Sequence, residues 1–136
     1  MTGAQMEALH RACFTVPRPW SAAEFSDLRA SPLCFVVGDA QGFAMGRVVA
    51  GEAELLTLAV DPLLRRHGIG TALVQRFVEQ ARKRGGEQAF LEVVADNEAA
   101  KSLYLAAGFA VTGVRRGYYH SSDGSRRDAL IMTRTL

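Results

Sequence analysis

The chain has 136 residues, of which 49% are hydrophobic and 22% are charged. This composition is typical of a globular protein and excludes disordered and fibrous chains, and the length predicts one domain over residues 1–136. The 16 basic and 14 acidic residues give a net charge of +2, which is too small to indicate a nucleic-acid or membrane partner. No apolar run reaches the roughly 20 residues that a membrane-spanning helix needs.

The N-terminal residues and the cysteines favour a cytoplasmic protein. The first residues lack both the basic start and the apolar segment of a secretory signal. Cys13 and Cys34 are far apart and fit no CxxC pattern, so we interpret them as free thiols in a reducing compartment. The histidines have no metal-ligand partner at a useful spacing, and we therefore expect no metal site.

Two short helices are expected at the N-terminal end. The first covers residues 4–14, where apolar residues gather on one side, and Pro17 and Pro19 end it. Ser21 and Glu24 have the spacing of a capping box and predict that the second helix begins there.

Three strands are expected next. Residues 33–37 and 43–49 are apolar and flank the turn sequence 38–42, so they are predicted to form a β-hairpin. A third strand covers residues 54–60 and ends before Asp61.

The second half of the chain alternates between helical and strand patterns. Apolar residues recur every four positions over residues 70–84, which predicts an amphipathic helix. The basic run at residues 82–84 suits the C-terminus of that helix better than a nucleic-acid patch. The remaining elements are a strand over 88–95, a helix to 107 capped by Asp96 or Asn97, and strands over 109–114 and 129–133. This order predicts an α/β fold with a mixed central sheet flanked by helices.

A glycine-containing loop precedes the long helix and has the sequence Arg65-Arg66-His67-Gly68-Ile69-Gly70. Glycine lets backbone N–H groups approach a ligand, and the helix N-terminus adds a partial positive charge, so the loop can bind a phosphate or diphosphate. On local grounds a tight strand-to-helix turn is an equally open interpretation. The third glycine of the Rossmann fingerprint and the Gly-Lys-Ser/Thr sequence of a P-loop are absent.

Two motifs, in the same order, resemble those of the GNAT superfamily of N-acetyltransferases. The loop resembles its acetyl-CoA motif, through Arg65-x-x-Gly68-x-Gly70. The second motif is matched by Asn97-x-x-Ala100-x-x-Leu103-Tyr104-x-x-x-Gly108-Phe109. The ordered pair is far more specific than either motif alone.

A narrower resemblance is to the bacterial ribosomal-protein alanine N-acetyltransferases. It rests on Leu91-Glu92-Val93, Arg115-Arg116-x-Tyr118-Tyr119, Asp123-Gly124, Asp128-Ala129-x-Ile131-Met132 and Pro19-Trp20-Ser21 with Phe25. That family opens with a strand before its first helix, whereas this sequence starts almost at the helix. We therefore expect the first edge strand of the sheet to be missing.

The resemblance implies acetyl-CoA as the donor. The pantetheine arm is expected along the third strand, at Leu58, Ala59 and Val60. The diphosphate is expected at the loop and the helix start, at Arg65, Arg66, His67, Gly68, Ile69, Gly70 and Thr71. Asn97 is expected to touch the donor, although a simple helix N-cap explains it equally well.

Glu92 and Tyr104 are the candidate catalytic residues. Glu92 lies among apolar neighbours, where a carboxylate is unfavourable unless it is paired or used. An ion pair with an arginine explains it as well locally, and the resemblance implies a general base acting through water. Tyr104 keeps its proton at pH 7 and can protonate the departing thiolate. Helical spacing alone would make it a core aromatic, and the family motif favours the acid.

The acceptor is predicted to be the N-terminal α-amine of a ribosomal protein, attacking the donor directly in a ternary complex. An α-amine is deprotonated more easily than lysine, so one modest base suffices. Trp20, Tyr118 and Tyr119 are expected to line the peptide groove and Glu52 to be an acceptor-side acid, with packed aromatics and a solvated charge as the alternatives. Three functional alternatives stay open: an acetyltransferase for a small amine, a non-catalytic acetyl-CoA-binding module and, more weakly, an RNA-associated domain.

Overall fold

A computed structural model describes residues 1–14, 18–65 and 67–136 of the chain. The elements are α1 (Gly3–Cys13), α2 (Ala22–Ala30), β1 (Cys34–Asp39), β2 (Gly42–Val49), β3 (Glu52–Val60), the 3-10 turn η1 (Pro62–Leu64), α3 (Ile69–Lys83), β4 (Gln88–Val94), α4 (Glu98–Ala106), β5 (Ala110–His120) and β6 (Arg126–Thr135). The strands form one six-stranded sheet in the order β1-β2-β3-β4-β6-β5. The predicted α/β fold with a mixed sheet is confirmed, and no strand precedes α1 within residues 1–14.

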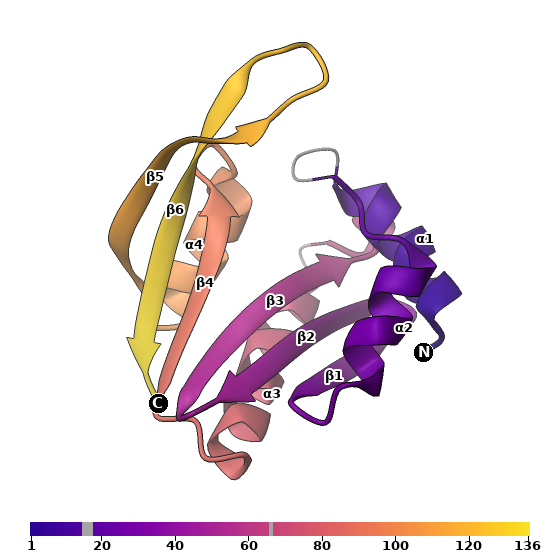
Figure 1. Cartoon of the computed structure of the whole chain (residues 1–136), viewed down its shortest axis with the longest axis vertical. Coiled ribbons are helices and arrows are strands. Elements are labelled where there is room, and N and C mark those ends of the chain that lie inside the picture. Colours follow the sequence, from indigo (N-terminus) through magenta and orange to yellow (C-terminus); the bar gives the residue numbers. More distant parts are fainter. Residues whose placement is uncertain (15–17, 66) are drawn as a thin grey trace.

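The sheet divides where β3 meets β4. All neighbouring strands are antiparallel except this parallel pair. The two strands are paired only over residues 52–54 of β3 and 88–90 of β4, and beyond this point they diverge (Figure 1). The facing edges of β3 and β4 are therefore left without a strand partner along most of their length.

A β-bulge lies on β3 just beyond the dividing point. Met45 is paired with Thr57 but the next residue, Gly46, is paired with Leu55, so Leu56 is an extra residue in β3. The bulge changes the face on which the β3 side chains lie. Before it, Leu55 packs with α3, and after it Thr57 contacts α1.

Two hydrophobic clusters cover the two faces of the sheet. On one face α3 packs through Phe77 against Phe35 of β1. On the other, α1 and α2 pack through Met6 and Phe25 against Phe43 of β2. Each fully buried side chain of this size stabilises the fold by roughly 1.5–3 kcal/mol. The helices are thereby fixed on opposite faces of β1–β3.

Short-range signals predicted the helix ends well. The Ser21–Glu24 capping box is present at α2. The basic residues Arg82 and Lys83 lie in the last turn of α3, as expected for a helix C-terminus. Within the described residues no helix combines the length and hydropathy that crossing a membrane requires.

The last two strands are much longer than the predicted 109–114 and 129–133. They extend to residue 120 in β5 and begin at residue 126 in β6, and they form a hairpin that projects from the sheet (Figure 1). Residues 115–120 are mostly polar and exposed, so no apolar alternation marked them as strand. Pairing with β6 holds them, with an irregularity at which the Gly117 N–H donates to an Asp128 carboxylate oxygen at 2.8 Å.

Candidate active site

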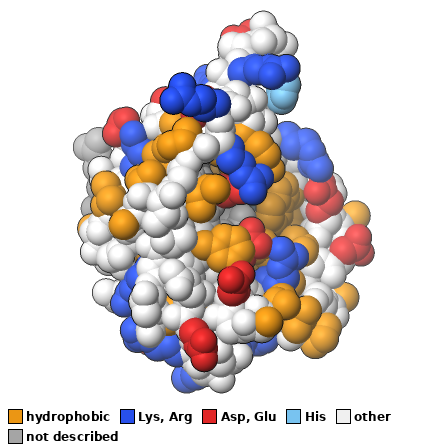
Figure 2. Space-filling model, turned by 60° about the vertical axis from the view of Figure 1, so that its left-hand side comes forward, with side chains coloured by type: hydrophobic (Ala, Val, Ile, Leu, Met, Phe, Trp, Pro, Cys, Tyr) orange, Lys and Arg blue, Asp and Glu red, His pale blue; other side chains and the backbone are white. Residues whose placement is uncertain are grey.

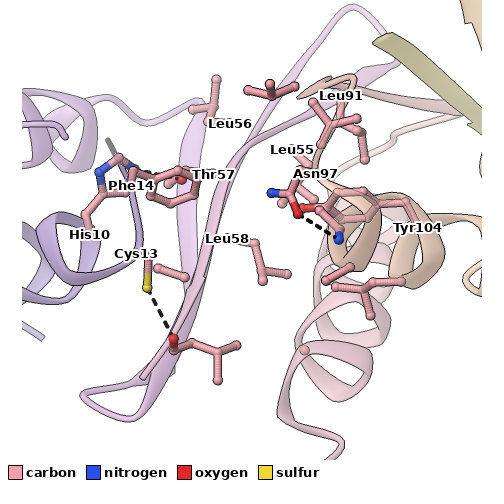
Figure 3. A pocket seen from close by; sticks show the side chains of 18 of the residues that line it. His10, Cys13, Phe14, Leu55, Leu56, Thr57, Leu58, Leu91, Asn97 and Tyr104 are labelled. Carbon is pink, nitrogen blue, oxygen red and sulfur yellow. Dashed lines mark hydrogen bonds between the residues drawn. The ribbon is translucent and has the colours of Figure 1, made fainter. Parts of the chain in front are cut away.

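A cavity of about 810 Å³ opens where β3 and β4 diverge. This size is typical of a small-molecule or cofactor site. Figure 2 shows the face as hollowed below the projecting hairpin, with hydrophobic side chains around the hollow and charged ones beside it. In Figure 3, Leu56, Thr57 and Leu58 of β3 lie across the cavity from Asn97 and Tyr104. Residues of α1, the first turn of α3, α4 and β5 complete its lining.

Backbone groups of β3 face the cavity at alternate residues. The Asp61 N–H donates to the Gln41 carbonyl at 2.8 Å, and in an antiparallel ladder only every second residue pair is hydrogen-bonded. In this register Ala59 is bonded to β2, whereas Leu58 and Val60 turn their N–H and C=O groups away from β2. The Val60 carbonyl accepts from the Cys13 thiol of α1 at 3.2 Å, which leaves the Leu58 backbone groups and the Val60 N–H on the open edge. A linear ligand with amide groups can therefore bind alongside β3.

The N-terminus of α3 borders the cavity with unpartnered backbone N–H groups. Its cap is Gly68, without a capping side chain, and the first helical hydrogen bond runs from the Ala72 N–H to the Gly68 carbonyl at 3.1 Å. The N–H groups of Ile69, Gly70 and Thr71 thus have no partner within the helix, and they carry its partial positive charge. These residues border the cavity, so a phosphate group can accept from them.

Two glycines shape this turn for different reasons. Gly68 has a left-handed backbone with φ +76°, and a Cβ there would meet nothing within 4 Å, so the requirement is conformational. A Cβ on Gly70 would lie 3.2 Å from the Leu103 side chain, so the requirement is close packing on α4. Arg65 also borders the cavity, whereas His67 is exposed and its Nδ1 lies 3.0 Å from the Leu64 carbonyl. The predicted contact at Arg66 lies outside the described residues.

Asn97, the N-cap of α4, and Tyr104, within α4, both border the cavity. The Asn97 side-chain oxygen accepts from the Ala100 N–H at 3.2 Å, so it caps α4 while also bordering the cavity (Figure 3). Tyr104 is buried and packs edge-on against Phe109, with ring centroids 6.1 Å apart. Burial raises the pKa of the Tyr104 phenol above its usual value, so the hydroxyl stays protonated and can act only as a donor of its proton.

Glu92 and the β5 residues form the opposite end of the cavity. The Glu92 carboxylate lies 3.4 Å from Nε of Arg115, and the Arg115 guanidinium lies over the Tyr118 ring at 5.1 Å. Burial, and secondly the Glu92 carboxylate, raise the pKa of Tyr119 to about 12. Glu92 therefore has the arginine partner considered from the sequence and also faces the cavity.

Residues of the α1–α2 side complete this end, with one change from the prediction. Trp20 borders the cavity and stacks on His10 at 5.3 Å between ring centroids. Glu52 does not border it, because Glu52 is exposed at the start of β3, where β3 is still paired with β4. Glu54 borders the cavity and pairs with Arg47 at 2.8 Å. Within the described ranges no group of three or more possible metal ligands occurs.

A model of the acetyltransferase (GNAT) family matches residues 4–109 of this chain. The chain belongs to the GNAT family of acetyltransferases. The predicted fold class and enzyme class are thereby confirmed. Nothing in the comparison assigns individual residues, so the roles of Glu92, Tyr104 and the other site residues stay predictions.

Relatives within the GNAT family agree with the narrower resemblance. The chain is 41% identical over 118 residues to the [ribosomal protein bS18]-alanine N-acetyltransferase of Escherichia coli K12, covering 84% of this chain and 79% of that protein. It is 36% identical over 135 residues to the N-alpha-acetyltransferase RimI of Mycobacterium tuberculosis H37Rv, covering 93% and 82%. The crystal structure of the Escherichia coli ribosomal-protein-S18-alanine N-acetyltransferase has a TM-score of 0.86 and 32% identity, covering 98% of this chain and 87% of that one.

Several residues of this GNAT site could not be recognised from the sequence. The bulge at Leu56 and the cavity-facing Thr57 and Glu54 carried no local signal, because strand pairing alone decides which residue is extra and which faces inward. His10 was placed on the first helix, and only the packing of α1 on β3 brings it to the cavity.

Proposed function

We propose that this GNAT protein transfers the acetyl group of acetyl-CoA to the N-terminal α-amine of a protein, with an alanine-starting ribosomal protein as the acceptor. The observation that carries the proposal is a single cavity with an uncapped helix N-terminus at one end and Glu92 with two tyrosines at the other. Two relatives named above support the acceptor: one is named as an alanine N-acetyltransferase of ribosomal protein bS18, and the other as an N-alpha-acetyltransferase.

The donor is assigned to the α3 end and the open edge of β3. Its diphosphate would accept from the N–H groups at the start of α3, with Arg65 adding positive charge. Its pantetheine amides would bond to the backbone of Leu58 and Val60, and Asn97 would contact it from α4. With the donor in this position, its thioester would lie on β3 near the bulge, beside the end of the cavity that holds Glu92.

The acceptor amine is assigned to the Glu92 end. An α-amine has a pKa of about 7.7–8.0, so removing its proton at pH 7 costs only about 1 kcal/mol. Glu92 takes this proton, through a water, and Arg115 holds the carboxylate in position. Trp20, Tyr118 and Tyr119 form the walls around the first residues of the peptide.

Transfer then proceeds by direct attack. The neutral amine nitrogen forms a bond to the thioester carbon, and backbone N–H groups on the open edge of β3 stabilise the oxyanion. Collapse of the intermediate breaks the carbon–sulfur bond. The Tyr104 hydroxyl supplies a proton to the departing thiolate. The nitrogen loses its second proton to water as the amide forms, Tyr104 recovers a proton from water, and acetylated peptide and CoA leave.

Release of CoA thiol in the presence of acetyl-CoA and defined acceptors tests this proposal. One acceptor set holds N-terminal peptides of small ribosomal proteins, including those that start with alanine, and the other holds free amines and amino acids. We expect turnover with alanine-starting peptides that disappears when their α-amine is blocked. Turnover with free amines alone would refute the protein acceptor and leave a small-amine acetyltransferase. Tight acetyl-CoA binding without any turnover would favour a non-catalytic module.

A further inference from the structure

His10 is a buried histidine that the proposed chemistry does not use. It lies on α1 with 1% of its surface exposed. Its ring packs against Phe14, Trp20 and Phe25, at 4.4, 5.3 and 5.4 Å between centroids. A buried polar ring needs hydrogen-bond partners, and here both of its nitrogens have one.

The two hydrogen bonds determine where the imidazole proton lies. The Trp20 backbone N–H donates to Nδ1 at 3.1 Å, so Nδ1 must be the unprotonated nitrogen. Nε2 lies 3.0 Å from the Thr57 hydroxyl oxygen and therefore carries the proton and donates it there. Burial lowers the pKa of His10 to about 4, so this neutral form is the one present near pH 7.

Thr57 receives the Nε2 proton and still has its own hydroxyl proton to donate. Its backbone is paired with Met45 and its side chain borders the cavity (Figure 3). Across residues 1–14, 18–65 and 67–136, the bond to His10 is the one hydrogen bond this hydroxyl makes. Because His10 donates to this oxygen from α1, the hydroxyl proton is left without a partner among these residues, on a side chain that borders the cavity.

We propose that His10 is a positioning residue that fixes the Thr57 hydroxyl as a donor to the first peptide carbonyl of the acceptor. This rests on the peptide acceptor of the proposed function. A donor at this place selects an acceptor with a carbonyl next to the reacting amine, which every peptide has and a simple amine lacks. The same ring also accepts a hydrogen bond from the Trp20 backbone at Nδ1. His10 therefore links Thr57 on β3 with Trp20, and both of these residues lie on the acceptor side of the cavity.

The chain offers matched variants for a kinetic test. Thr57→Val removes the hydroxyl and Thr57→Ser keeps it. His10→Gln places an amide N–H near Nε2 and keeps the bond to Thr57, whereas His10→Asn can accept only from Trp20. We expect the peptide KM to rise roughly fivefold to tenfold in Thr57→Val and His10→Asn, as loss of one neutral hydrogen bond predicts. Thr57→Ser and His10→Gln should stay within about twofold of the parent, and the KM for acetyl-CoA should not change.

A modified acceptor separates this role from a structural one. In a peptide of the same sequence, the first amide is replaced by a thioamide, which exchanges only the first carbonyl oxygen for sulfur, a much weaker hydrogen-bond acceptor, and adds no charge. The parent enzyme should show a higher KM for this analogue than for the peptide, by the same fivefold to tenfold, and Thr57→Val should not distinguish the two. If Thr57 had only a structural role, Thr57→Val would raise the KM for the peptide and the KM for the analogue by the same factor.

Three outcomes would overturn the inference. They are an unchanged peptide KM in Thr57→Val, a rise in KM from the peptide to the thioamide analogue that is the same in the parent and in Thr57→Val, or a His10→Gln variant as impaired as His10→Asn. Imidazole nitrogen NMR of the parent protein provides a test that does not depend on variants folding, and a protonated Nδ1 at pH 7 would also overturn it. A parent enzyme without turnover on any peptide would refute the proposed function and this inference together. Peptide turnover with an unaffected Thr57→Val refutes the inference alone.

Discussion

Glu92 and Tyr104 approach the cavity from opposite faces of β4. Leu91 and Val93, the neighbours of Glu92 along the strand, belong to the same core cluster as Tyr104, so the alternation of side chains turns Glu92 to the other face. The proposed base and the proposed acid thereby lie on opposite faces of β4, and the thioester is expected between their side chains. One group can remove a proton from the amine while the other supplies one to sulfur.

Glu92→Gln should slow the enzyme most where the amine still carries its proton. We expect kcat/KM for the peptide to fall about a hundredfold at pH 7, as is usual for loss of a general base. Above the α-amine pKa of about 8 the acceptor is already neutral, so the defect should shrink by pH 9. Rates of parent and variant from pH 6.5 to 9.5 measure this, and a defect that is constant over the whole range would contradict the role.

His10 should make folding sensitive to mild acid. Burial lowers its pKa in the folded chain from 6.5 to about 4, although the Glu24 carboxylate favours the charged form. Between these values the unfolded chain binds more protons, so the free energy of unfolding falls as the pH falls, by about 3 kcal/mol in total. Urea denaturation at pH 7, 5.5 and 4.5 measures this. His10→Phe keeps an aromatic ring and should flatten the dependence, and an equal slope in both proteins would refute it.

At the scale of elements, the turn into α3 is the part on which donor binding is proposed to depend. A left-handed glycine begins the helix at residue 68, and another, Gly85, follows its C-terminus with φ +83°. A Cβ would meet nothing within 4 Å at either position. The two residues therefore have the same conformational requirement, but only Gly68 lies at the cavity.

Gly68→Ala and Gly85→Ala form a matched pair. Each places a Cβ on a left-handed backbone, so we expect each to lower the free energy of unfolding by about 1–2 kcal/mol. Only Gly68→Ala should weaken acetyl-CoA binding, because a displaced turn misaligns the N–H groups that hold the diphosphate. Calorimetric titration of both variants measures the difference, and equal affinities would argue against the diphosphate site.

At the scale of the whole molecule, the two halves of the sheet are joined by a short parallel pairing. Only residues 52–54 and 88–90 pair directly between β3 and β4. A donor bound as proposed would contact β3 and α3 on one side and α4 on the other. It would therefore act as a bridge between the halves, in addition to being a reactant.

Acetyl-CoA should accordingly stabilise the fold as a whole. At a hundred times its Kd it adds about 2.7 kcal/mol, which for a chain of this size corresponds to a rise in Tm of roughly 10 °C. Amide hydrogen exchange should slow on both β3 and β4. Pantetheine, which lacks the diphosphate, is the control and should give a much smaller shift. Protection confined to α3 would contradict a donor that lies along β3.

Whether the role of a residue could be predicted from the sequence depends on how far along the chain its partners lie. The Ser21–Glu24 box, the turn at Gly68 and the Asn97 cap depend on neighbours a few positions away, and the sequence was sufficient for them. The strand content of residues 115–120 was missed, because these polar residues are held by β6 rather than by an apolar pattern of their own.

The amino-acid sequence alone established the family, the order of the elements and the loop that is expected to bind the diphosphate, because periodicity and motif spacing are properties of the linear chain. The contacts between side chains that are distant in the sequence follow only from the tertiary structure. His10 contacts Thr57 across 47 positions, and Arg115 reaches Glu92 from a strand two places away in the sheet. The position of the bulge and the divergence of β3 from β4 depend on how β3 pairs with β2 and β4, and the sequence of β3 by itself does not mark which residue is extra.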